Sequence, residues 1–399
     1  MGKINFGVNM AAKLFLKKNE DRRIRSGHLW IFSNEVQSLQ GEAENGDLVE
    51  IYDSQNGFLG TGFYNKNSLI SCRLLSGSAI EDFHWLIKER ILNALKLRRE
   101  FYPGEESFRL VFSESDFLPG LIIDKYNSTF VLQVYSCGME KNIQTVAEVL
   151  KTELNAESIF TKNEKSFRRM EGLPEEDSIY LGSVEPCIIS VGSIKYKIDF
   201  EKGHKTGFYF DQRDNRFFVE KISKGKSVID AFCNSGGFGM HAAKAGASSV
   251  KFIDSSSFAI ELAKQNCLMN DIRGNTEFVV SQVYEYFESL LSEKQQFDVV
   301  MIDPPAFAKK FKDLPAAKKG YEKLNRLALQ LINGNGFLVT SSCSHHVTKE
   351  DFIQIVTDAA RKADKKIQLI HFNGASLDHP ELPAMIETSY LKFCVFRVV

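Results

Sequence analysis

The sequence predicts an α/β protein whose C-terminal half is a doubly wound parallel sheet, preceded by a small β-barrel and a mixed α+β segment. Strand and helix patterns alternate from residue 228 onward, which is typical of a parallel sheet with crossover helices. The strands of that half lack polar alternation, as expected where helices cover both faces of a sheet. Short strands between Gly, Asn and Ser turns fill residues 30–76 and predict the barrel.

Composition narrows the class of protein before any motif is considered. The 399 residues suffice for about two to four domains. Hydrophobic residues make up 43% and charged residues 25%, the balance of a soluble globular protein. No apolar run approaches the ~18 residues of a membrane span, and the first residues lack a secretory pattern. We therefore expect a cytoplasmic protein without a membrane partner.

The cysteines and the net charge argue against a disulfide-bonded or metal-binding protein and against a polycation. The seven cysteines are scattered and form no C-x-x-C pair, so we expect reduced thiols and no metal site. The net charge of −1 excludes a general polycation. Basic residues nevertheless gather in the first 30 positions, where they could contact phosphates or simply face solvent. They are Lys3, Lys13, Lys17, Lys18, Arg22, Arg23 and Arg25.

In the N-terminal half, β-branched and aromatic residues between turn residues predict strands, and apolar residues at helical spacing predict helices. The expected strands are 48–54, 57–65, 69–75, 108–115, 120–126, 129–136 and 158–163; the expected helices are 81–102 and 141–154. In the C-terminal half the expected order is strand 227–232, helix 238–246, strand 249–256, helix 258–270, strand 276–281, helix 284–293, strand 297–302, helix 321–332 and strand 337–340.

A glycine-rich loop follows the first strand of the C-terminal half. Asp230 ends that strand, and residues 231–239 contain three glycines before a helix opens. Glycines there let a ligand approach the backbone, and an acid ending the second strand, Asp254, is placed for a ribose diol. The loop is not G-x-G-x-x-G, which favours S-adenosylmethionine over a dinucleotide. The alternative is a tight turn beside solvated carboxylates.

Two later strand ends add reactive groups. Asp303 precedes two prolines that fix a stiff turn and direct the carboxylate into the crevice at the sheet edge. Cys343 follows the strand 337–340, where a thiol is placed for a nucleophile. His345 and His346 could act as general acids or bases, and they lack an obvious third partner for a metal. A buried, inert cysteine is the alternative.

Five motifs in this chain resemble those of class I S-adenosylmethionine-dependent ribosomal RNA methyltransferases that carry an N-terminal PUA domain and make 5-methylcytosine in large-subunit RNA. They are residues 27–36, 116–124, 203–216, 303–307 and 342–346. The resemblance covers nearly the whole chain. It implies a PUA-like RNA-binding domain at 1–77, a central α+β domain at 78–188 and a Rossmann-like methyltransferase domain at 189–399.

The resemblance also implies roles for individual residues. The residues implied to contact S-adenosylmethionine are Gln212, Arg213, Asp230, Cys233, Asn234, Ser235, Gly236, Asp254, Gln282 and Asp303. Asp254 would hold the ribose, and Gln212 and Arg213 would close over the cofactor. Family members usually place an aspartate after the third strand, where this chain has Gln282, so the contact to the adenine would come from an amide.

The chemistry implied by the resemblance is covalent catalysis on cytosine. Cys343 would add to carbon 6, and Asp303 would bind the base or the cofactor amine. The implied partner is RNA, and relatives suggest that a homodimer is possible. The basic residues and the aromatic residue of 161–171 suit single-stranded RNA; the alternative is a charged surface loop. Alternatives are methylation of another base atom such as guanine nitrogen 7, which needs no cysteine, a non-catalytic RNA-binding factor, and, least favoured, a dinucleotide oxidoreductase.

Overall fold

The computed structural model describes residues 12–203, 205–308 and 310–399. The chain forms two compact units, each assembled from three segments. The first contains Met1–Cys187, Ile198–Phe208 and Asp378–Thr388, and the second contains Ile188–Lys197, Tyr209–Leu377 and Ser389–Val399. Among the described helices, none has both the length and the apolar character that crossing a bilayer requires.

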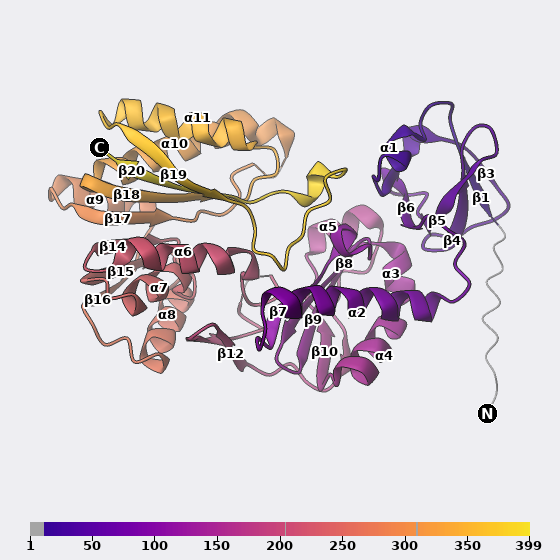
Figure 1. The fold of residues 1–399 in the computed structure, drawn as a ribbon, viewed down its shortest axis with the longest axis horizontal. Coiled ribbons are helices and arrows are strands. Elements are labelled where there is room, and N and C mark those ends of the chain that lie inside the picture. Colours follow the sequence, from indigo (N-terminus) through magenta and orange to yellow (C-terminus); the bar gives the residue numbers. More distant parts are fainter. Residues whose placement is uncertain (1–11, 204, 309) are drawn as a thin grey trace. The chain divides into compact units, whose positions relative to one another are not determined.

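The N-terminal part of the first unit is a six-stranded sheet in the order β2-β6-β5-β4-β1-β3 (Figure 1). The elements are β1 (Lys13–Leu16), α1 (Arg22–Arg25), β2 (Trp30–Phe32), β3 (Val36–Gln40), β4 (Leu48–Tyr52), β5 (Phe58–Tyr64) and β6 (Ile70–Ser76). Alternate side chains such as Leu14, Ile31 and Ile51 point inward and are fully buried, which gives the small barrel its own core.

A second part of the first unit contains a five-stranded sheet in the order β11-β10-β9-β8-β7. Its elements are α2 (Phe83–Phe101), β7 (Ser107–Phe112), β8 (Leu121–Tyr126), β9 (Thr129–Val134), α3 (Cys137–Lys141), α4 (Ile143–Leu154), β10 (Ser158–Thr161), α5 (Lys165–Glu171) and β11 (Ile179–Leu181). The side chain of Asp82 caps α2 by accepting the N–H of Trp85 at 2.9 Å. The helices α2 and α4 pack Ile87, Ile91 and Val146 into one core with the strands.

The second unit contains a seven-stranded sheet in the order β16-β15-β14-β17-β18-β20-β19. Its strands are β14 (Ser227–Ala231), β15 (Ser249–Asp254), β16 (Thr276–Val280), β17 (Phe297–Ile302), β18 (Ile332–Ser342), β19 (Ile367–Asn373) and β20 (Lys392–Val398). The first five run parallel, and β20 pairs antiparallel with β18 and with β19. A two-stranded sheet of β12 (Cys187–Val191) and β13 (Ile194–Ile198) precedes it.

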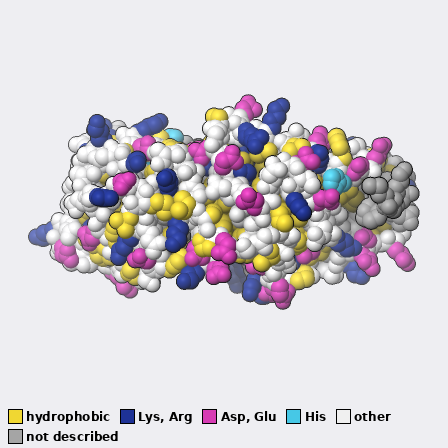
Figure 2. All heavy atoms as spheres, turned by 90° about the horizontal axis from the view of Figure 1, so that it is seen from below, with side chains coloured by type: hydrophobic (Ala, Val, Ile, Leu, Met, Phe, Trp, Pro, Cys, Tyr) yellow, Lys and Arg dark blue, Asp and Glu magenta, His cyan; other side chains and the backbone are white. Residues whose placement is uncertain are grey.

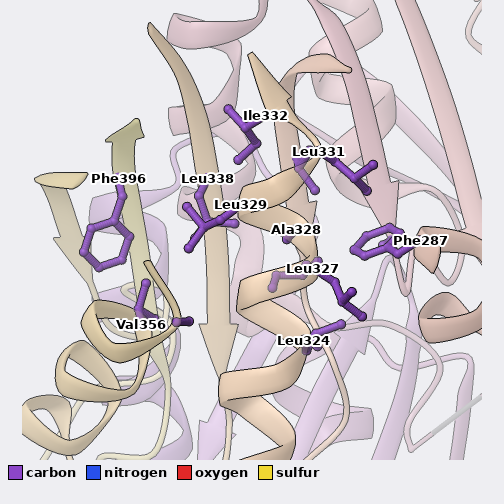
Figure 3. Packing of buried hydrophobic residues seen from close by; sticks show 14 of the residues in the cluster. Phe287, Leu324, Leu327, Ala328, Leu329, Leu331, Ile332, Leu338, Val356 and Phe396 are labelled. Carbon is purple, nitrogen blue, oxygen red and sulfur yellow. The ribbon is translucent and has the colours of Figure 1, made fainter. Parts of the chain in front are cut away.

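Helices cover both faces of this sheet, as Figure 1 shows. They are α6 (Arg213–Ser223), α7 (Gly237–Lys244), α8 (Ser257–Met269), α9 (Val283–Ser292), α10 (Leu314–Gln330) and α11 (Lys349–Lys362). Figure 3 shows the core on one side, where Leu324 and Leu327 of α10 and Phe287 of α9 pack beside the strands. Because the core lies against the middle of the strands, their carboxyl ends are left to form a site.

The predicted α/β class is confirmed, including the parallel sheet of the C-terminal half. The elements that were not predicted are β1, α1, α3, α5, β11, β12, β13, α6, α11, β19 and β20. Two predicted elements are longer than expected, because β18 begins at Ile332 and α10 begins at Leu314. The division of residues 1–188 into two domains stays a prediction, since both parts belong to one compact unit.

A buried ion pair ties distant segments of the first unit together. Arg98 of α2 is 1% exposed and donates to both carboxylate oxygens of Asp116, at 2.6 and 2.7 Å. The same guanidinium donates to the carbonyl oxygen of Asp378 at 2.8 Å, 280 positions along the chain. The carboxylate of Asp378 in turn accepts the N–H of Arg109.

Replacing Arg98 with methionine should therefore lower the free energy of unfolding by about 3–5 kcal/mol, because Asp116 would remain buried without its partner. A matched control is Arg169→Met, which removes an exposed pair with Glu175 and should change stability little. Urea unfolding of both variants measures the difference. Equal and small effects would show that the buried pair does not stabilise the unit.

Candidate functional site

The predicted site residues of the second unit gather at the carboxyl ends of four neighbouring parallel strands. Asp230 is the penultimate residue of β14, Asp254 ends β15, Asp303 directly follows β17, and Cys343 directly follows β18. The strand order β15-β14-β17-β18 places these ends side by side. Such a crevice at the carboxyl edge of an open α/β sheet is where ligands bind in this class of fold.

The loop after β14 turns sharply through left-handed backbone conformations. Phe232, Asn234 and Gly236 have φ angles of 60°, 46° and 84°. The backbone N–H of Asn234 donates to the Asp254 carboxylate at 3.0 Å, and the N–H of Gly236 donates to the carbonyl of Cys233 at 2.8 Å. The loop is therefore clamped to the end of β15, and α7 opens directly after it.

Glycine is required on the first turn of α7 because the helix packs closely against its neighbours. A Cβ at Gly239 would lie 2.2 Å from the ring of Phe252, and one at Gly237 would lie 2.6 Å from Nε of Arg216. The N–H of Gly239 donates to Asp230 at 2.7 Å. The first turn of α7 thus holds the buried carboxylate of β14 in a fixed position.

Asp303 is held by a chain of amides. Its carboxylate accepts the side-chain amide of Gln212 at 3.0 Å. The amide oxygen of Gln212 accepts from Asn215 at 2.7 Å, and Asn215 also contacts Asn373 and the carbonyl of Gly374. Since the Gln212 oxygen is already used by Asn215, its N–H groups must face Asp303. Gln212 therefore holds one oxygen of the carboxylate, and Ser341 also hydrogen-bonds to this carboxyl group.

Burial raises the pKa values of two of these carboxyl groups. The pKa of Asp230 rises to about 7, with a smaller opposing effect from the Gly239 N–H and a further increase from the charge of Asp303. The pKa of Asp303 rises to about 6, mainly through burial and then through Asp211. Two carboxylates that resist ionisation side by side favour a ligand that brings positive charge.

We expect Asp230→Asn to raise the free energy of unfolding of the ligand-free protein at pH 8 by about 2–4 kcal/mol, from ~1.4 kcal/mol per pKa unit. The folded-state pKa exceeds the unfolded one, so wild-type stability falls as the pH rises from about 4 to about 7. The asparagine oxygen can still accept the Gly239 N–H. Urea unfolding between pH 4 and 8 should show the slope in the wild type and its loss in the variant.

Asp298, on the same sheet, provides the opposite control. Burial alone would raise its pKa, but hydrogen bonds from Ser227 and Asn333 outweigh burial and lower it. Asp298→Asn should therefore destabilise the protein at pH 8. If both variants, or neither of them, stabilised the protein at pH 8, the raised pKa of Asp230 and the lowered pKa of Asp298 would be contradicted.

Cys343 lies in a segment fixed on both sides. The hydroxyl of Tyr321, which is fully buried in α10, bonds with Ser342 at 3.1 Å and with Ser344 at 3.0 Å. Cys343 itself is half-buried. The ring of His345 packs on Tyr390 with 5.4 Å between centroids. The anchored serines hold the backbone that presents the thiol.

The other predicted residues divide into buried and exposed groups. Arg213 and Cys233 are 1% and 4% exposed, so each is an interior residue of the loop region. Asn234 and Ser235 are half-buried, and Gln282 is exposed at the start of α9. Gln282 lies two residues beyond the end of β16, and its side chain makes no capping hydrogen bond to α9.

Tyr209 was missed by the sequence analysis. It is half-buried, and its pKa is raised by burial and then by Asp211, Asp303, Cys343 and Asp254. Those influences place the ring among the carboxylates and the thiol of the site. The sequence did offer a way to find Tyr209, because the residue lies within the family motif at 203–216.

The basic segment expected at residues 161–171 is only partly available to a partner. Arg168 is 2% exposed and donates to the carbonyl of Val134 and to Glu140. Phe167 is 45% exposed, and Met170 is 63% exposed. On the face drawn in Figure 2, basic and acidic side chains are interspersed among the described residues. Among these residues, no group of three or more His, Cys, Asp and Glu could hold a metal ion.

Comparison with known proteins gives two family matches. Residues 177–397 match the S-adenosylmethionine-dependent methyltransferase family, and residues 14–77 match the PUA-like domain. The ribosomal RNA large subunit methyltransferase I of Aeromonas hydrophila is 36% identical, over 97% of this chain and 100% of the relative. The protein of that name from Shewanella frigidimarina is 36% identical, over 98% and 100%.

Among solved structures, SMU.776, described as a methyltransferase and crystallised with SAH, superposes with a TM-score of 0.83. The superposition covers 96% of this chain and 99% of that one, at 20% sequence identity. At that identity the likeness concerns the fold, which the two chains share over nearly their whole length.

Proposed function

Since the chain belongs to the family of S-adenosylmethionine-dependent methyltransferases, we propose that it methylates carbon 5 of a cytosine in large-subunit ribosomal RNA. The class of substrate is supported by the two relatives named as ribosomal RNA methyltransferases and by the PUA-like domain. The base and the atom are supported by one observation above all. A half-buried thiol, Cys343, follows the strand next to Asp303 at the same sheet edge.

The residues at the edge fit S-adenosylmethionine. The cofactor carries an ammonium and a sulfonium, and burial raises the pKa values of the carboxyl groups of Asp230 and Asp303, an effect that a nearby cation would oppose. In this proposal Asp254 holds the ribose, Asp230 and the 233–236 loop hold the amino-acid end, and Gln212 and Arg213 close over it. Gln282, exposed beside β16, is proposed for the adenine.

When bound, the cofactor supplies an electrophilic methyl group. Carbon 5 of cytosine is too weak a nucleophile to take it directly. The Cys343 thiolate therefore adds to carbon 6, forming a carbon–sulfur bond and moving an electron pair towards carbon 5 and the ring. After alkylation a base removes the carbon-5 proton, the carbon–sulfur bond breaks, and the thiolate is restored.

Asp303 assists the addition in this proposal. In its protonated form the carboxyl group donates to ring nitrogen 3 and stabilises the negative charge that the addition creates. A pKa raised to about 6 by burial keeps part of the population protonated near neutral pH. Gln212, fixed by Asn215, holds one carboxyl oxygen so that the other can face the base.

RNA contacts outside the site are proposed for the PUA-like domain and for α5. In this proposal the exposed ring of Phe167 stacks on an unpaired base, and the exposed side chain of Met170 offers a further apolar contact. Lys165 and Arg169, both exposed, would approach phosphates, although Arg169 already pairs with Glu175.

The test is transfer of a labelled methyl group from S-adenosylmethionine to unmodified large-subunit RNA, followed by separation of the product nucleosides. We expect the label in 5-methylcytidine. Label in 7-methylguanosine or another nucleoside would overturn the choice of base. Absence of transfer together with measurable cofactor binding would favour a non-catalytic RNA-binding role.

A further inference from the structure

Lys392 is a buried cation beside the segment that carries Cys343. It begins β20, is 7% exposed, and pairs in register with Ser342 of β18, the residue that precedes Cys343. Its Nζ donates to the carbonyl oxygen of Ser344, which follows Cys343, at 2.7 Å, and to that of Tyr390 at 2.7 Å. The ammonium is therefore fixed against the backbone that directly follows the thiol.

Within the described part of the chain, Lys392 has no carboxylate within ion-pair distance. Its two recorded acceptors are neutral carbonyl oxygens. A buried ammonium normally needs an anionic partner, because desolvation disfavours the charged form. The groups facing it that can become anionic are the thiols of Cys343 and Cys394, and Lys349 also acts on Cys394.

We propose that Lys392 is a positioning residue that favours the thiolate form of Cys343. The inference rests on the proposed function in giving the thiol a nucleophilic role. The proton leaves Sγ for solvent, and the fixed ammonium then faces the sulfur anion.

The electrostatics of Lys392 agree with this role. Burial lowers the pKa of Lys392 to about 8, and the thiols of Cys343 and Cys394 act in the opposite direction. The lysine is thus charged at neutral pH and loses its charge as the pH rises through about 8. Its effect on the thiol should be present below that pH and should fade above it.

The first test is the rate at which iodoacetamide alkylates Cys343, resolved by peptide mass spectrometry between pH 6 and 10. We expect Lys392→Met to slow alkylation at pH 7 by about tenfold, which corresponds to an increase of about one unit in the pKa of the Cys343 thiol. The difference should shrink above pH 9, and Lys392→Arg should restore the rate. Lys349→Met, which removes an exposed lysine of the same unit, should leave the profile unchanged.

A second test covers the case in which the methionine variant does not fold. In Cys343→Ala, the pKa of Lys392, followed by the NMR shift of its ε-carbon, should fall because a neighbouring anion has been removed. Cys187→Ala, at a half-buried thiol of β12, should not change it. Identical alkylation profiles in the wild type and Lys392→Met, or an unchanged Lys392 pKa in Cys343→Ala, would overturn the proposal.

These outcomes are separable from those of the proposed function. Alkylation and the NMR titration need neither RNA nor turnover, so they report on the pairing of the lysine and the thiol alone. If Cys343→Ala still methylated RNA, the nucleophilic role would fall, whatever the alkylation profiles showed.

Discussion

Replacing Cys343 with alanine should reduce methyl transfer to ribosomal RNA by about 10⁴-fold or more, the scale seen when a covalent nucleophile is removed. The loss should appear in kcat, because the thiol acts on the reacting carbon. Cofactor affinity should change little, since none of the predicted cofactor residues lies on β18 or in the segment directly after it. Single-turnover transfer and a cofactor titration measure the two quantities separately.

The matched control is Cys187→Ala, which removes another half-buried thiol, that of β12, a strand outside the seven-stranded sheet. It should keep wild-type transfer. If Cys343→Ala retained transfer within a few fold, the covalent route would be wrong, and methylation of a base atom that needs no thiol would take its place.

Replacing Asp303 with alanine should lower kcat by about 10²–10⁴-fold, the usual contribution of a positioned acid or base. The pKa of Asp303 is raised to about 6, chiefly by burial. Because the protonated form is the proposed donor, the wild-type rate should lose this contribution as the pH rises through about 6. The variant should lack that limb of the pH–rate profile.

Asp298→Asn is the control for this profile, because its carboxylate lies on β17 and bonds Ser227, at the start of β14. The variant should keep the limb near pH 6. A limb that survived in Asp303→Ala would mean that another group carries the proton. A rate that rose rather than fell through pH 6 would make Asp303 a carboxylate acceptor instead of a donor.

Much of the site could be predicted because its residues follow directly from local chain geometry. Glycines after β14 and prolines after Asp303 mark sharp turns at strand ends, and parallel strands bring those ends together. Helix α11 could also have been predicted from the sequence. Its sequence offers Thr348 as a cap, acids in the first turn and basic residues in the last, which are ordinary helix signals.

The features of the site that could not be predicted depend on contacts between residues that are far apart in the sequence. The amide chain that fixes Asp303 joins Gln212 to Asn215 and then to Asn373, 158 positions further along. Lys392 meets the Cys343 segment only through the antiparallel pairing of β20 with β18. No local pattern predicts either contact, and none predicts that Asp378–Thr388 returns to the first unit.

The central claim is that Cys343 attacks carbon 6 of a cytosine, and trapping the adduct tests it most directly. Large-subunit RNA containing 5-fluorocytidine would be incubated with the protein and S-adenosylmethionine, because fluorine at carbon 5 prevents the proton loss that releases the enzyme. The account predicts a covalent RNA–protein complex whose cross-linked peptide contains Cys343. An adduct on another cysteine, or no adduct while unsubstituted RNA is methylated, would contradict it.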